Sequence, residues 1–270
     1  METRFFRSLA LPNGTYKTTA YGRLSDLDQA LLRFLPAAKD LMLLDAGASS
    51  GATTLDWMSL LETRGYAPHV VLADLFITAT LVSIAGGLDL LFLTEGKLAQ
   101  LCLRSRCFCR PVGNWLTARG TVLRAAFSIL ELAWKAGLLP VRSAHPIRLV
   151  SSRLLNRTTV TCEERDLRRP VAGWRGRFHV VRAANLLNRA YFPESTLATI
   201  IRNLLDTLRP GGLLVLCRTH SDGRNHASVV QVLPQGFATV VLRLGDGSEV
   251  EELALDVAQE RVAATTHDGR

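Results

Sequence analysis

The feature that most constrains the fold is a glycine turn joining a short apolar run to a helical segment. Residues 41–44 are continuously apolar and lead into Asp45-Ala46-Gly47, and 52–64 carries apolar residues at helical spacing. A second apolar run, 69–73, follows and ends at Asp74. Apolar runs of this length suit strands buried on both faces. The order strand, helix, strand therefore predicts an α/β fold with a parallel sheet.

The alternation of predicted strands and helices resumes late in the chain. Further strands are predicted at 158–161, 178–181 and 213–217, with a long helix at 193–208. The segments 238–244 and 250–257 flank Gly245-Asp246-Gly247-Ser248, which predicts a hairpin that closes the sheet with antiparallel strands. The expected fold is a mostly parallel sheet with antiparallel end strands, within a single domain over 1–270.

A long insertion separates the second predicted strand from the third. Its roughly 80 residues far exceed the usual connection of about 2–6 residues, so it needs structure of its own. We expect an inserted cap subdomain over 78–156, with a β-hairpin at 88–103 and an apolar helix at 115–137. Two interpretations of that helix stay open. It is either buried in the core of the insertion or it contacts an apolar substrate or the membrane interface.

Composition limits the partners and the compartment. The net charge is +8, and 28 of the 32 basic residues are arginines, which favours anionic partners. Because the arginines are scattered, no nucleic-acid footprint is evident. The five cysteines fit neither a disulfide framework nor a metal knuckle, and the first residues contain no apolar run of signal-peptide length. These features predict reduced cysteines, no metal and a cytoplasmic protein, with membrane association as an alternative.

The chemistry is expected at the turn over 45–51, which has the pattern D-x-G-x-x-x-G. Glycines there let the backbone approach a ligand closely, and the following helix offers free N–H groups. A nicotinamide dinucleotide site would carry G-x-G-x-x-G, which is missing, so an oxidoreductase is disfavoured. The acidic first residue, Asp45, fits a ligand that carries an ammonium group.

With Asp74 ending the second strand and Leu208-Arg209-Pro210-Gly211-Gly212 preceding the fifth, the sequence resembles class I S-adenosylmethionine-dependent methyltransferases. The resemblance spans about 41–75 and 158–219, and it implies a Rossmann-like sandwich that binds S-adenosyl-L-methionine. In that family the glycine loop wraps the methionine half of the cofactor. An acid after the second strand binds the ribose, an acid after the third lies near the adenine, and the end of the fourth lies near the methyl group. The matching residues here are Asp45, Gly47, Ser49, Gly51, Asp74, Leu75, Asp166 (with Glu163 as a competitor), Leu167 and Asn185.

The resemblance implies methyl transfer to a small-molecule or lipid-like acceptor. His220, just after the fifth predicted strand, is the candidate general base, because an imidazole can accept a proton near neutral pH. The fourth strand lacks the N/D-P-P-Y signature of many amino-group methyltransferases, which leaves the acceptor open. The alternatives are a non-catalytic protein that keeps the fold and acts on a membrane or partner, and a protein carboxyl methyltransferase.

Overall fold

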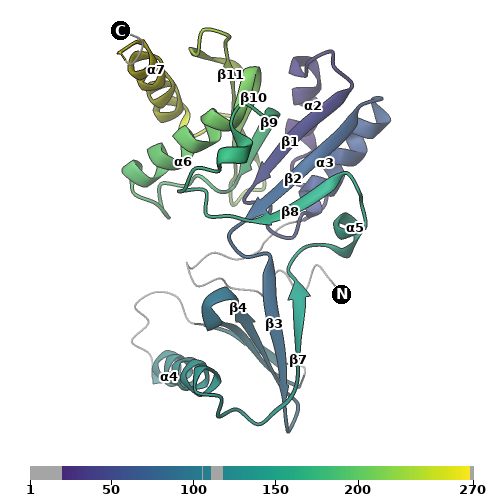
Figure 1. Ribbon diagram of the computed structural model, residues 1–270, viewed down its shortest axis with the longest axis vertical. Helices are drawn as coiled ribbons and strands as arrows, with labels where there is room; N and C mark the ends of the chain where they lie inside the picture. Colours follow the sequence, from purple (N-terminus) through teal and green to yellow (C-terminus); the bar gives the residue numbers. More distant parts are fainter. Residues whose placement is uncertain (1–19, 105, 111–117, 268–270) are drawn as a thin grey trace. The chain divides into compact units, whose positions relative to one another are not determined.

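The computed structural model describes residues 20–104, 106–110 and 118–267, and the chain divides into two compact units (Figure 1). One unit is the insertion Phe76–Ser151. The other joins Tyr21–Leu75 to the segment that begins at Ser152. The insertion therefore leaves the larger unit directly after the second strand and returns to it before the third.

The larger unit is built on a seven-stranded sheet in the order β12-β11-β10-β9-β1-β2-β8. Its strands are β1 (Asp40–Ala46), β2 (Ala67–Asp74), β8 (Val160–Glu164), β9 (Phe178–Ala184), β10 (Leu208–Thr219), β11 (Asn225–Val232) and β12 (Ala238–Leu244). The five strands from β8 to β10 are mutually parallel, and β11 is antiparallel to both of its neighbours. The predicted mostly parallel sheet with an antiparallel end is thus confirmed.

Helices cover both faces of this sheet, with α2 and α3 on one face and α6 and α7 on the other (Figure 1). The helices of this unit are α2 (Ser25–Leu31), which continues as η1 (Leu32–Phe34), α3 (Ala52–Thr63), α5 (Ser152–Leu155), η3 (Ala172–Trp174), α6 (Glu194–Thr207) and α7 (Glu251–His267). On α6, the fully buried Leu197, Ile201 and Leu204 recur at steps of four and three, so one face of the helix enters the core.

Strand order reverses at β1, which lies between β2 and β9. The chain passes from β1 through α3 to β2 on one side, and the later strand β9 pairs on the other side. Open α/β sheets bind ligands at such a switch point, outside the carboxyl ends of the strands. The turn over 45–51 follows β1 at this position.

One local prediction was wrong. The strand expected at 250–257 belongs to α7, and β12 pairs with β11 instead. Val250, Ala254 and Val257 are buried at steps of four and three, which is a helical period that the hairpin-like turn before them obscured.

The insertion is an antiparallel sheet in the order β6-β5-β4-β3-β7, together with one long helix. Its elements are β3 (Thr78–Ile84), β4 (Leu88–Leu93), η2 (Thr94–Gly96), β5 (Leu98–Leu103), β6 (Arg106–Cys109), α4 (Ala118–Lys135) and β7 (Val141–Arg148). The hairpin expected at 88–103 is present as β4 and β5. The helix expected at 115–137 is α4, and 115–117 lie outside the described residues. Within the described part of the chain, no helix combines the length and apolar character needed to span a bilayer.

A disulfide joins Cys102 to Cys107, contrary to the expectation of reduced cysteines. These two residues are register partners across β5 and β6, so the hairpin sets them opposite one another. Their spacing in the sequence gave no sign of the pairing, because β6 was not predicted. Disulfides persist mainly in oxidising compartments, so the cysteines do not support a cytoplasmic location.

Candidate functional site

The glycine loop after β1 turns back against the end of β2. Gly47 and Gly51 have φ of +71° and +78°, and Ser49 has φ of +59°. The N–H groups of Gly47 and Ala48 both donate to the carbonyl of Ala73, at 2.8 and 3.2 Å. A Cβ at Gly51 would lie 2.1 Å from Cδ1 of Leu154, so no side chain fits there without displacing that leucine.

Asp74 fastens the loop to the end of β2. Its Oδ2 accepts a hydrogen bond of 2.7 Å from the N–H of Ser49, and the side chain is largely buried. The structure thus brings together Gly47, Ser49, Gly51 and Asp74, four of the residues predicted to bind the cofactor. Leu75, the next of them, is 38% exposed.

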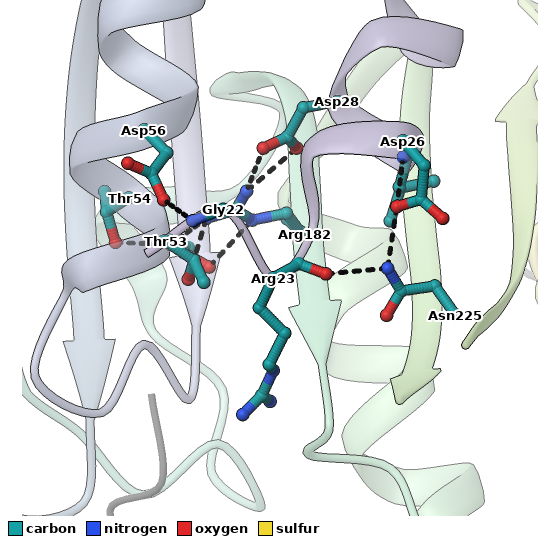
Figure 2. Close-up of polar contacts among 11 residues, drawn as sticks. Gly22, Arg23, Asp26, Asp28, Thr53, Thr54, Asp56, Arg182 and Asn225 are labelled. Carbon is teal, nitrogen blue, oxygen red and sulfur yellow. Dashed lines mark hydrogen bonds and ion pairs between the residues drawn. The ribbon is translucent and has the colours of Figure 1, made fainter. Parts of the chain in front are cut away.

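Asp45 lies in a buried charge network instead of facing the loop. Arg182 of β9 donates from Nη2 to Oδ2 of Asp45 at 2.6 Å and from Nη1 to Oδ1 of Asp28 at 3.0 Å. Thr54 also donates to Asp45 at 2.6 Å. Figure 2 shows the Arg182 guanidinium directed at Asp28 of α2. An ammonium group would have to compete with Arg182 for Asp45.

This network holds one cation between two carboxylates, with no access to solvent. Arg182 is fully buried, and its guanidinium lies 4.4 Å from the ring centroid of Trp57. Burial raises the pKa of Asp28 to about 6, against the opposing effect of Arg182. Burial also disfavours the charge on Arg182, but Asp45 and Asp28 outweigh it and raise the pKa of the guanidinium.

Sequence reasoning missed this network, although a signal was available. Arg182 directly follows the predicted strand at 178–181 and precedes two alanines, and an arginine inside a buried strand requires an acidic partner. Asp28 lies on α2, far from Arg182 in the sequence. The partners could not be identified, because 154 residues separate Asp28 from Arg182 along the chain.

The turn after β8 holds Asp166 and Leu167. The Arg168 side chain and backbone N–H donate to Asp166, and the Arg168 hydrogen bond lowers the pKa of that carboxyl. Leu167 packs against the core of the unit, and its carbonyl accepts a bond from Asn203. The N–H of Arg165 donates to the carbonyl of Asp74 at 2.9 Å, so this turn begins beside Asp74. The competitor Glu163 pairs with Arg165.

Asn185 joins the ends of β9 and β10. It has φ of +58°, its N–H donates to the carbonyl of Cys217, and its Oδ1 accepts the N–H of Thr219 at 2.8 Å. His220 follows at the end of β10 as an exposed side chain. Its ring stacks on His226 of β11, with centroids 4.2 Å apart. Asn185 and His220 therefore lie at the carboxyl edge of the sheet, the edge that carries the glycine loop.

No model of a protein family matches the chain, and no curated protein matches it in sequence. Solved structures resemble it in fold. The CMeT domain of the citrinin polyketide synthase is 17% identical over 72% of this chain and 34% of that chain, with a TM-score of 0.34. CalS10, an amino pentose methyltransferase from Micromonospora echinaspora solved with SAM bound, is 14% identical over 88% and 82%, with a TM-score of 0.38. The [4+2]-cyclase SpnF is 15% identical over 87% and 55%, with a TM-score of 0.35.

This chain thus spans about a third of the length of the citrinin synthase structure. Because every one of these TM-scores is below 0.5, the fold assignment rests on strand order and on the loop after β1. Strands β8, β2, β1, β9 and β10 follow the doubly wound order 3-2-1-4-5, and the glycine loop stands at the point where that order reverses. The chain therefore has a doubly wound, Rossmann-like α/β fold.

Proposed function

We propose that the chain binds S-adenosyl-L-methionine at the carboxyl ends of β1 and β2 and transfers its methyl group to a small-molecule or lipid-like acceptor. The observation that carries the proposal is the contact between Asp74 and the glycine loop. It sets a buried carboxylate beside Gly47 and Gly51, whose left-handed backbone permits a close approach. These residues fit a ligand with vicinal hydroxyls and a polar chain.

In this proposal each residue has a defined task. Asp74 accepts hydrogen bonds from the ribose hydroxyls, and Asp166, with Leu167, lies at the adenine. When bound, the cofactor supplies an electrophilic methyl group on a sulfonium sulfur. The chain aligns the acceptor for in-line attack and excludes water. If the acceptor is a hydroxyl, a base must take its proton, and His220 is the candidate because it stands at the same edge of the sheet.

A non-catalytic protein that keeps this fold is the second candidate. The observation that favours it is the occupation of Asp45 by Arg182, which removes one carboxylate from the expected cofactor set. Such a protein would bind the cofactor weakly or not at all and would act through the insertion. The role of 78–156 as a cap, and the assignment of its contacts to an acceptor, stay predictions.

The test is a transfer assay with S-adenosylmethionine labelled in its methyl group, offered lysate fractions that include lipids and proteins. We expect label in one fraction with the wild type and a loss of at least ten-fold with Asp74→Ala. The matched control, Glu260→Ala, removes an exposed carboxylate of α7 that pairs with Arg202, and it should keep full transfer. Label in the lipid, small-molecule or protein fraction identifies the acceptor class. Cofactor binding without transfer to any fraction would favour the non-catalytic candidate.

A further inference from the structure

Helix α4 is apolar on two opposite faces, and the described residues cover only one of them. On the covered face Phe127 is fully buried, and Trp134 stacks on Phe92 with ring centroids 4.8 Å apart. Glu131 also turns inward, where it accepts the N–H of Leu98 and pairs with Arg110. The interpretation of α4 as a helix within the core of the insertion therefore holds for this face alone.

The opposite face exposes four large aliphatic side chains. Val122, Ile129 and Leu132 are 69%, 65% and 70% exposed, and Leu138, just beyond the helix, is 76% exposed. No other large hydrophobic side chain in the described residues is as exposed as these four. The spacings of seven and three align the three helical residues along one side of α4. We call these four residues the α4 patch.

The positive charge of the protein is concentrated in the unit that carries the α4 patch. Residues 76–151 contain nine Lys or Arg against three Asp or Glu, a net charge of +6. The segments 21–75 and 152–270 together contain twenty of each sign and are neutral. Two exposed cations are also close to the patch residues in the sequence. Lys135 ends the helix three residues after Leu132, and Arg142, at the start of β7, follows Leu138 by four residues. The patch is thus an aliphatic surface on a strongly basic unit.

We propose that the α4 patch binds the surface of an anionic lipid bilayer. Aliphatic side chains insert at the boundary between headgroups and acyl chains, while nearby Lys and Arg contact the anionic headgroups. A second copy of the chain fits less well, since pairing two such faces would bring one net charge of +6 against another. A nucleic acid would satisfy the charge but would leave the aliphatic side chains without an apolar partner.

Vesicle flotation with the 270-residue chain tests the proposal. The vesicles contain either phosphatidylcholine alone or phosphatidylcholine with about a third phosphatidylglycerol. We expect flotation with the anionic vesicles at low salt and little with the neutral ones. Because exposed charges are screened by salt, 0.5 M NaCl should weaken the binding by about ten-fold or more.

Substitutions separate the α4 patch from the rest of the surface. Ile129→Ser with Leu132→Ser should weaken vesicle binding at least ten-fold, and an unchanged melting temperature verifies the fold. Lys135→Glu with Arg142→Glu should weaken it to a similar extent, since each basic residue near an anionic surface contributes roughly a five-fold effect. The matched controls lie in the neutral unit: Phe237→Ser, at an aromatic side chain that is 51% exposed, and Arg224→Glu should both bind like the wild type.

Two outcomes would overturn the proposal. In one, the wild type stays in solution with the anionic vesicles at low salt. In the other, the Ile129→Ser, Leu132→Ser variant floats as well as the wild type. Sedimentation velocity without vesicles tests the alternative that a second copy of the chain binds the α4 patch. A wild-type dimer that the same variant converts to a monomer, together with no flotation, would assign the patch to a second copy.

Discussion

Replacing Arg182 with methionine is expected to lower the free energy of unfolding by about 3–5 kcal/mol, because it leaves two buried carboxylates without their cation. Arg182 holds Asp28 and Asp45 together inside the larger unit and contacts the Trp57 ring. Methionine keeps much of the apolar part of the arginine side chain. The loss of stability should therefore come from removing the guanidinium charge and not from lost packing. Urea denaturation followed by circular dichroism measures the change.

A matched variant and a rescue sharpen this test. Arg224→Met removes a guanidinium that is 83% exposed and lies 3.8 Å from Asp222, so we expect less than about 0.5 kcal/mol. Adding Asp28→Asn to Arg182→Met should recover part of the lost stability, because one orphaned carboxylate disappears. A loss below about 1 kcal/mol for Arg182→Met would show that the network does not hold the fold.

The pH dependence of stability should change when Asp28 becomes asparagine. Burial raises the pKa of Asp28 to about 6 in the folded protein, while the unfolded carboxyl keeps its ordinary value of 3.8. Between these values the folded state binds a proton that the unfolded state has released. Asp28 therefore lowers stability as pH rises from about 4 to 6, and the cost stays constant above that range.

Asparagine cannot ionise, so Asp28→Asn abolishes this contribution. Relative to the wild type, the variant should gain up to about 3 kcal/mol of stability between pH 4 and pH 7, from roughly 1.4 kcal/mol for each unit of pKa. Chemical denaturation of both proteins at the two pH values measures the difference directly. A difference that is the same at both pH values would mean that Asp28 is ionised throughout.

The larger unit was predictable because its signals are local and ordered. Apolar runs before Gly47 and Asp74 identify β1 and β2, and the turn at Pro210 precedes the main part of β10. The insertion was harder, because strands β3, β6 and β7 depend on antiparallel partners that no local pattern specifies. α7 was missed because Gly245 and Gly247 resemble a hairpin turn, although buried residues recur along it at a helical period.

The candidate site was predicted only where it depends on the backbone. Gly47, Gly51 and Asp74 are set by the strand–turn–helix geometry, and they lie together as the motif implied. Asp45 differs, because its carboxylate binds Arg182 from a strand that enters the sheet more than a hundred residues later. Side-chain pairings across such separations arise from tertiary packing, which the periodicity of a single segment does not encode.

Calorimetric titration with S-adenosylhomocysteine, the demethylated cofactor product, tests the central claim most directly. We expect the wild type and Glu260→Ala to bind with the same affinity. Asp74→Ala should bind at least ten-fold more weakly, because it loses charge-assisted hydrogen bonds worth about 1.5–3 kcal/mol each. Asp74→Asn keeps an oxygen that can accept the N–H of Ser49 and so preserves the loop. Weaker binding by this variant would therefore come from a lost contact with the ligand and not from a displaced loop. No heat of binding with the wild type, or equal affinity in Asp74→Ala, would contradict the assignment of the cofactor to this site.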